Sequence, residues 1–264
     1  MKISKVYSVY FSATYTTRKV VRGITEQLGG EVAEYDITSN NIKDNIEFSR
    51  GDVLVTGMPV YGGRIPASTL QSIAKLKGNG SPAIITCVYG NRDYDDALLE
   101  LRNVVEARGF KVISASAFIA RHSIFTQIAT DRPTEEDLCQ VSNMANTSKN
   151  IINSIDDFEN IAQIPIKGNM PYKEFNQLPI YPSADESCVN CGRCAEKCPV
   201  KAIAFVDAMQ TNEEKCIACG RCIIECPIGA RAFRSEFYEA RSAKFMDAFS
   251  TPKENQVYFA VINK

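Results

Sequence analysis

The chain has 264 residues, of which 45% are apolar and 23% are charged, and its formal net charge is −1. These proportions are typical of a soluble globular protein, and the length suits about two domains of roughly 150 residues each. The charge gives no basis for binding nucleic acid or an anionic membrane, and no run approaches the ~20 consecutive apolar residues of a membrane span.

The N-terminal residues lead directly into a strand-like run, without the long uncharged segment of a signal peptide. In such a chain the 10 cysteines are expected to bind metal more often than to form disulfides. We therefore expect the protein to be cytoplasmic.

Residues 1–155 alternate strand-like and helix-like patterns. The predicted strands are 5–10, 31–37, 52–56, 83–88 and 111–118, and the predicted helices are 16–28, 67–76, 93–108 and 134–155. Strands such as 83–88 are apolar throughout, which is typical of strands buried on both faces of a parallel sheet. The sequence thus predicts an α/β fold with a doubly wound, five-stranded parallel sheet in the order 2-1-3-4-5.

Three loops follow predicted strands at the carboxyl edge of this sheet. The first, residues 12–17, combines Ser and Thr hydroxyls with the N–H groups of a starting helix; this suits a phosphate, although Ser and Thr are also ordinary helix caps. The second (58–66) and third (89–94) place Tyr beside Gly, which either admits a flat ligand close to the backbone or simply makes a turn. Because the topology brings all three loops to one crevice, we expect one binding site there.

The first loop also carries a resemblance to a known family. Ser12, Thr14 and Thr17 match the Ser/Thr-x-Thr-Gly-x-Thr pattern of flavodoxins, with Tyr15 at the position of the family's Gly. Residues 1–155 therefore resemble a flavodoxin, which implies FMN with its phosphate in the first loop and its ring between the other two. On this resemblance, the residues expected to bind FMN are Ser12, Thr14, Tyr15, Thr16, Thr17, Pro59, Tyr61, Gly62, Gly63, Tyr89, Gly90, Asn91, Arg92 and Tyr94.

Other reactive side chains of this part are more isolated. His122, the single histidine, follows the fifth predicted strand and is a candidate catalytic residue, with a surface or packing role as the alternative. Cys87 lies within an apolar strand and Cys139 lies on the last predicted helix. Neither has the spacing of a redox pair, so we expect no functional role for them.

Between residues 188 and 226, eight cysteines form two copies of Cys-x-x-Cys-x-x-Cys-x-x-x-Cys-Pro, 28 residues apart. This is the spacing of a two-cluster bacterial ferredoxin, in which three thiolates of a run bind one 4Fe-4S cluster and the fourth reaches the other. We assign one cluster to Cys188, Cys191, Cys194 and Cys226, and the other to Cys198, Cys216, Cys219 and Cys222. Structural zinc is the alternative, but zinc sites need neither a third Cys in the run nor Cys-Pro.

The two copies share a Gly-Arg pair, whose arginines, Arg193 and Arg221, we expect to be solvated. The predicted domains are a flavodoxin-like FMN-binding domain, a stiff linker rich in proline, a small α+β ferredoxin-like domain and a tail that packs on one of the domains. Their predicted bounds are 1–155, 156–182, 183–235 and 236–264, respectively.

The order flavodoxin then ferredoxin resembles bacterial flavodoxin–ferredoxin fusion proteins over nearly the whole chain. The resemblance implies electron transfer between two 4Fe-4S clusters and FMN, with a redox partner protein or a small-molecule electron acceptor. One alternative is a ferredoxin-dependent flavin reductase, an oxidoreductase with its own small acceptor. Another is a cluster protein whose flavodoxin-like domain is only a docking module.

Overall fold

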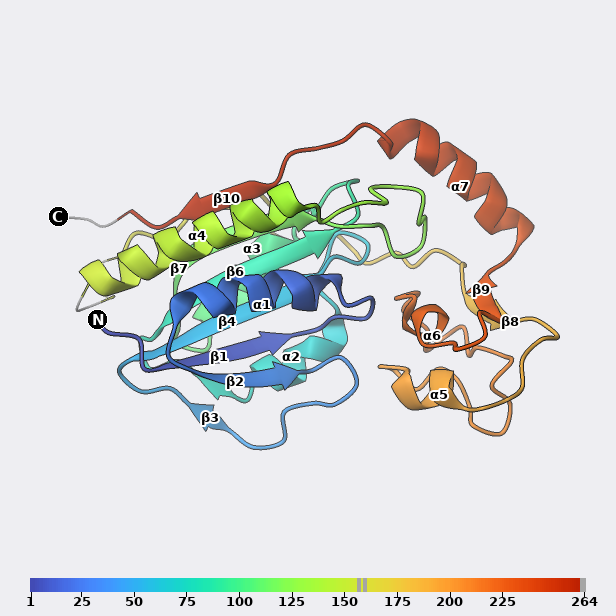
Figure 1. The fold of residues 1–264 in the computed structure, drawn as a ribbon, viewed down its shortest axis with the longest axis horizontal. Helices are drawn as coiled ribbons and strands as arrows, with labels where there is room; N and C mark the ends of the chain where they lie inside the picture. The colour runs from blue at the N-terminus through green and yellow to red at the C-terminus, as the bar shows by residue number, and fades with distance from the viewer. Residues whose placement is uncertain (156–157, 159–160, 262–264) are drawn as a thin grey trace.

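The computed structural model describes residues 1–155, 158 and 161–261. Parts of the predicted linker (156–157 and 159–160) and the end of the predicted tail (262–264) lie outside the described residues. An α/β sandwich occupies one side of the molecule, and a smaller cysteine-rich module faces the carboxyl ends of its parallel strands (Figure 1).

Within the described residues, the central sheet has six strands in the order β10-β7-β6-β4-β1-β2. Five of them run parallel: β1 (Lys5–Tyr10), β2 (Glu31–Asp36), β4 (Asp52–Pro59), β6 (Pro82–Tyr89) and β7 (Lys111–Ile119). Their order confirms the predicted 2-1-3-4-5 arrangement, so the fold is flavodoxin-like. The sixth strand, β10 (Gln256–Phe259), pairs antiparallel with β7 and extends the predicted five-stranded sheet.

Helices cover both faces of the sheet (Figure 1). On one face α1 (Thr16–Leu28) packs beside α4 (Glu135–Ser154), and α3 (Ala97–Glu106) covers β6 and β7 on the other. The predicted start of α4 at residue 134 agrees with the structure, in which Thr134 is the N-cap and forms a reciprocal capping box with Asp137. Helix α3 begins later than its predicted start at residue 93, since Asp95 adopts a positive φ of 44° that no α-helix continues through.

The predicted helix 67–76 is broken into short pieces. A 3-10 turn over Ala67–Thr69 leads into a single turn, α2 (Leu70–Ile73). The last predicted helical residue instead opens β5 (Leu76–Lys77), which pairs with β3 (Ile46–Glu47) in a small parallel sheet. The apolar pattern of this stretch therefore reflects burial rather than a continuous helix.

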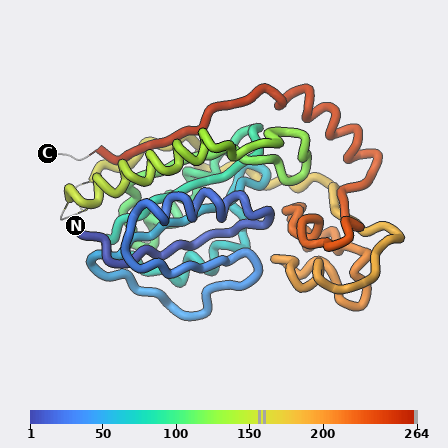
Figure 2. Tube along the Cα trace, viewed as in Figure 1, coloured from blue at the N-terminus to red at the C-terminus, as the bar shows by residue number. Residues whose placement is uncertain are grey.

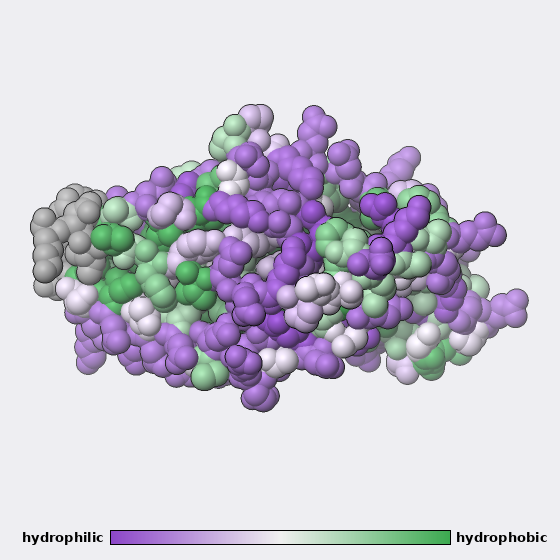
Figure 3. Space-filling model, turned by 90° about the horizontal axis from the view of Figure 1, so that it is seen from above, coloured by the Kyte–Doolittle hydropathy of each residue, from purple (hydrophilic) through white to green (hydrophobic). Residues whose placement is uncertain are grey.

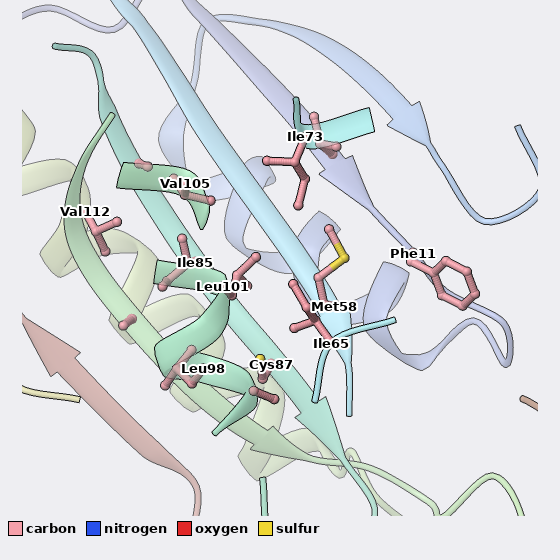
Figure 4. Packing of buried hydrophobic residues seen from close by; sticks show 14 of the residues in the cluster. Phe11, Met58, Ile65, Ile73, Ile85, Cys87, Leu98, Leu101, Val105 and Val112 are labelled. Carbon is pink, nitrogen blue, oxygen red and sulfur yellow. The ribbon is translucent and has the colours of Figure 1, made fainter. Parts of the chain in front are cut away.

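The hydrophobic core between the sheet and α3 is continuous (Figure 4). Leu98 and Leu101 of α3 pack in it with Met58 of β4 and Ile85 of β6, and all are fully buried. Cys87 lies in the same core, fully buried, and so behaves as a small apolar side chain.

The cysteine-rich module has little regular structure of its own. Strands β8 (Pro182–Ala184) and β9 (Arg231–Phe233) pair antiparallel, and the short helices α5 (Arg193–Lys197) and α6 (Arg221–Ile224) each follow a Gly in the left-handed conformation. This is the small α+β arrangement expected for the second half of the chain. No helix among the described residues is long and apolar enough to cross a membrane.

The chain then returns from the module to the sheet. Helix α7 (Glu236–Phe249) leads into a segment that runs back along the upper side of the sandwich to β10 (Figure 2). Polar residues cover most of this upper face, and apolar residues show there only as separate patches (Figure 3).

The segment before the module is tied to the sandwich by carboxylates. Asp96 is buried and accepts hydrogen bonds from the backbone N–H groups of Asn169 (2.8 Å) and Lys173 (2.6 Å). Asp93 pairs with Lys167 at 2.7 Å. This extended segment is therefore held in place by specific contacts as well as by its prolines.

Candidate cofactor sites

The first loop turns sharply into α1 through Tyr15. Its φ of 66° is the left-handed conformation that favours glycine, so the turn is kept although flavodoxins carry Gly at this position. Ser12 is buried, and its hydroxyl accepts from the backbone N–H of Arg18 at 3.0 Å. The side chain of Tyr15 points to the cysteine-rich module, where its hydroxyl donates to Glu225.

A narrow cavity of about 40 Å³ lies where the loops meet. It is lined by Thr14, Thr16 and Thr17 of the first loop, together with residues from the carboxyl ends of β4, β6 and β7. The hydroxyls of Thr14 and Thr16 lie 3.4 Å apart. The cavity therefore has hydroxyls at the start of a helix, which suits a phosphate.

A wide, open cavity of about 320 Å³ borders it and shares Tyr61, Tyr89, Gly90 and His122 with the narrow one. One wall is formed by the two tyrosine loops, which are the second loop (58–66) and the third loop (89–94). The opposite side consists of residues 173–178 of the linker and of Ile217 and Ala218 from the second cysteine run. The wide cavity is thus built from both halves of the chain.

The structure brings most of the predicted FMN residues to these cavities. Those that line one or both are Thr14, Thr16, Thr17, Pro59, Tyr61, Gly62, Gly63, Tyr89, Gly90 and Arg92. The other four predicted residues line neither cavity; they are Ser12, Tyr15, Asn91 and Tyr94. The amide of Asn91 holds the tail instead, because it donates to Phe249 O and Thr251 O at 2.8 Å; the buried hydroxyl of Tyr94 bonds to Tyr258 at 2.9 Å.

Sequence reasoning did not find several parts of the cavity walls. They include residues 120–125 after β7, apart from His122, residues 173–178 of the linker, Ile217 and Ala218 of the second run, and Arg241 and Phe245. In the linker, Phe175 stands against Gly62, where an added Cβ would lie 3.0 Å from its ring. The sequence feature that could have indicated this part of the wall is an aromatic residue within a proline-rich linker.

His122 is a partly buried packing residue that also lines both cavities. Its Nδ1 accepts hydrogen bonds from the backbone N–H groups of Ile124 and Phe125, both at 3.1 Å, so a neutral ring carries its proton on Nε2. Burial and the charge of Arg92 lower the pKa of His122 to about 4. A Cβ at position 90 would lie 2.5 Å from the His122 ring, so Gly90 leaves the space that this ring fills.

The eight run cysteines separate into two groups around two small cavities. The inner set, Cys198, Cys216, Cys219 and Cys222, lines one of them. The outer set, Cys188, Cys191, Cys194 and Cys226, lines the other. These are the same two sets that the sequence predicts as ligands, with the fourth cysteine of each run crossing to the other site.

Cavities walled by thiols fit a polynuclear cluster, whose ligands surround an inorganic core. Gly192 and Gly220 begin their helices with φ near 75°, so the backbone turns tightly beside each cavity. Among the described residues, no three His, Cys, Asp or Glu side chains converge closely enough to hold a single metal ion. All cysteines in the two sets are free.

Arg221 joins the inner set to the sandwich, and the expectation that it is solvated is wrong. Its side chain is 8% exposed, whereas that of its repeat partner Arg193 is 55% exposed. Its guanidinium donates to Ala13 O (3.1 Å), stacks on the Tyr15 ring (4.4 Å to the centroid) and pairs with Glu225 (3.4 Å). The difference arises because only the second run faces the first loop.

Comparison with known proteins agrees with the second half of the chain. Residues 187–230 match the family model of the 4Fe-4S dicluster domain. A search of curated proteins gave no match.

Several solved structures resemble the sandwich. They include a flavodoxin from the domain Archaea (12% identity, 56% of this chain and 99% of that chain, TM-score 0.41) and flavodoxin 1 of Bacillus cereus (14%, 56% and 98%, TM-score 0.44). A WrbA-like flavodoxin of Agrobacterium tumefaciens is similar at 14% identity (57% and 98%, TM-score 0.42).

The strand order and the matched segment together define the class of protein. The chain joins a flavodoxin-like α/β sandwich to a 4Fe-4S dicluster domain. This is the arrangement of a flavodoxin–ferredoxin fusion.

The pKa of His122 leads to a testable pH dependence. Since burial lowers this pKa to about 4, the unfolded chain binds the proton more tightly than the folded chain does. The contribution of the neutral ring to stability is therefore complete above pH ~6.5 and is lost as the pH falls toward 4. Between pH 7.5 and 5.5, the free energy of unfolding should fall by about 1 kcal/mol through His122 alone.

The measurement is denaturant unfolding at both pH values, for the parent chain and for His122→Asn. The amide oxygen of Asn can still accept a backbone hydrogen bond but does not titrate in this range. The parent chain should lose about 1 kcal/mol more than the variant does. Equal losses would show that His122 is not held neutral by burial.

Proposed function

We propose that the chain is an electron-transfer protein that passes electrons between two 4Fe-4S clusters and a bound FMN. One observation carries the proposal: residues between inner-set cysteines line the same cavity as the tyrosine loops. Ile217 and Ala218 lie between Cys216 and Cys219, and they border the wide cavity together with Tyr61 and Tyr89. When bound, the clusters exchange single electrons and the flavin exchanges one or two, with protons.

The three-threonine wall of the narrow cavity is the proposed phosphate end of the FMN site. Thr14, Thr16 and Thr17 supply hydroxyls there, beside the N–H groups at the start of α1. The ring would then extend toward the wide cavity between the tyrosine loops. Tyr61 stays protonated in this position, because burial raises the pKa of its phenol well above the ordinary value.

The proposed ligands of the clusters are the inner and outer sets. Cys219 is buried in the same hydrophobic cluster as the sandwich core, whereas Cys191 is exposed. The inner set therefore lies nearer the proposed flavin site, and Cys191 brings the outer set to the surface. A redox partner protein would exchange electrons with the chain most directly at the outer set.

A flavin reductase with its own small acceptor would need space beside the flavin. The wide cavity is open and has Lys173 and Arg241 on its walls, so this second function has a structural basis. His122 can donate a hydrogen bond from Nε2 there, but its low pKa keeps it from being a charged acid near neutral pH. Steady anaerobic turnover of a quinone or nitro compound by the reduced protein would favour this function.

The proposed phosphate site can be tested with an isosteric change, Thr16→Val. Losing one hydroxyl that bonds to a charged phosphate should weaken FMN binding by roughly 10- to 100-fold, as a charge-assisted hydrogen bond contributes about 1.5–3 kcal/mol. The measurement is titration of the apoprotein with FMN, followed by flavin fluorescence. The exposed Thr147→Val on α4 is the matched control and should bind FMN normally.

Riboflavin, which lacks the phosphate, separates a phosphate contact from general damage to the site. Thr16→Val should leave riboflavin affinity unchanged. If both flavins lose affinity equally, Thr16 does not contact the phosphate. If the parent chain binds neither flavin, the sandwich has no flavin function.

The proposed ligand sets predict iron content. Cys216→Ser with Cys219→Ser should remove the inner cluster, and Cys188→Ser with Cys191→Ser the outer one, so each pair should lower iron and acid-labile sulfide by about half. Cys139→Ser, an exposed cysteine outside both sets, should change neither. Unchanged iron in either paired variant would contradict the assignment.

A further inference from the structure

The two cysteine runs differ at one buried position of the repeat. Ala202-Ile203-Ala204 of the first copy corresponds to Ala230-Arg231-Ala232 of the second, 28 residues later. Ile203 lines the inner cavity, and Arg231 lines the outer one. An apolar residue at one site is thus replaced by a cation at the other.

Arg231 is among the largest fully buried side chains of the protein, with 2% of its surface exposed. Its terminal nitrogens donate to backbone carbonyls, including Pro182 O at 2.8 Å, to Ala208 O and to the hydroxyl of Thr211. Its Nε is buried and has no hydrogen-bond partner. The guanidinium is therefore held in place, but one of its donors is left unsatisfied.

No carboxylate pairs with Arg231 in the described part of the chain. A buried charge without a counter-ion is costly, because desolvation removes its interaction with water and nothing replaces it. Carbonyl oxygens lower this cost but carry no net charge. A negatively charged group beside Arg231 would therefore stabilise it, and the described residues do not supply one.

The surroundings of Arg231 include cysteines of both sets. Cys194 of the outer set and Cys222 of the inner set belong to one buried cluster with Ala208, whose carbonyl accepts from both Arg231 and Cys194. Arg231 also lines the outer cavity together with Cys194. Its guanidinium thus lies close to a proposed ligand of each cluster.

We infer that Arg231 is a buried cation shared by the two cluster sites, and that its charge raises the reduction potentials of both clusters. The inference rests on the proposed cluster binding. A 4Fe-4S core held by four thiolates is a net anion, and reduction adds one further negative charge to it. A nearby positive charge in a medium of low dielectric stabilises the reduced form more than the oxidised form, so the potential rises.

The same charge accounts for the difference between the two copies at this position, Ile203 in the first and Arg231 in the second. One guanidinium between the two sites serves both, so the first copy keeps Ile203, which packs with Cys194 and Cys222. Arg231 is a positioning residue for the clusters and not a ligand.

The test is an anaerobic redox titration of the full chain with its clusters in place, followed by electron paramagnetic resonance of the reduced clusters. Arg231→Gln removes the charge, and Arg231→Lys keeps it. The matched control is Arg234→Gln. Arg234 also donates to backbone carbonyls of the module, Ser183 O and Ala230 O, but it is exposed and already paired with Asp185.

We expect Arg231→Gln to lower both potentials, while Arg231→Lys and Arg234→Gln keep them close to those of the parent chain. If Arg231→Gln does not load clusters but Arg231→Lys does, with parental potentials, the charge is needed for the clusters and the inference also holds. Unchanged potentials in Arg231→Gln, or failure of Arg231→Lys to load, would show that Arg231 only holds the backbone. Absence of iron–sulfur signals from the parent chain would instead contradict the proposed function.

Discussion

The guanidinium of Arg221 fixes the cysteine-rich module against the first loop of the sandwich. It reaches Ala13 O, the ring of Tyr15 and the carboxylate of Glu225 from a buried position. Buried polar contacts of this kind are strong when satisfied and costly when broken, so they define one arrangement of the two halves. The proposed electron transfer depends on a short and constant separation of the centres, which this network would hold fixed.

Two other connections hold the module from different sides. The segment before it is bound by Asp93 and Asp96, and the segment after it ends as β10 on the edge of the sheet. Asn91, which lies in a loop at the carboxyl edge, holds the tail through three hydrogen bonds. The loops of the sandwich therefore serve both the proposed flavin site and the docking of the module.

The sequence was most informative where structure depends on local pattern. The bounds of β1 and α1, the strand order and the two cysteine sets all follow from periodicity and spacing. It was least informative where a residue is defined by a distant partner. Arg193 and Arg221 have the same local sequence, yet only Arg221 meets the first loop; Asn91 and Tyr94 look like loop residues of a ligand site, yet their partners are in the tail. No local pattern encodes contacts between residues more than 150 positions apart.

The central claim is that one chain holds a flavin and two iron–sulfur clusters together. The most direct measurement is the content of iron, acid-labile sulfide and flavin per chain after anaerobic purification, together with the absorbance spectrum. The account predicts about eight iron atoms, about eight sulfides and one FMN, with flavin bands over a broad cluster shoulder. Zinc in place of iron, or clusters with no extractable FMN, would contradict it.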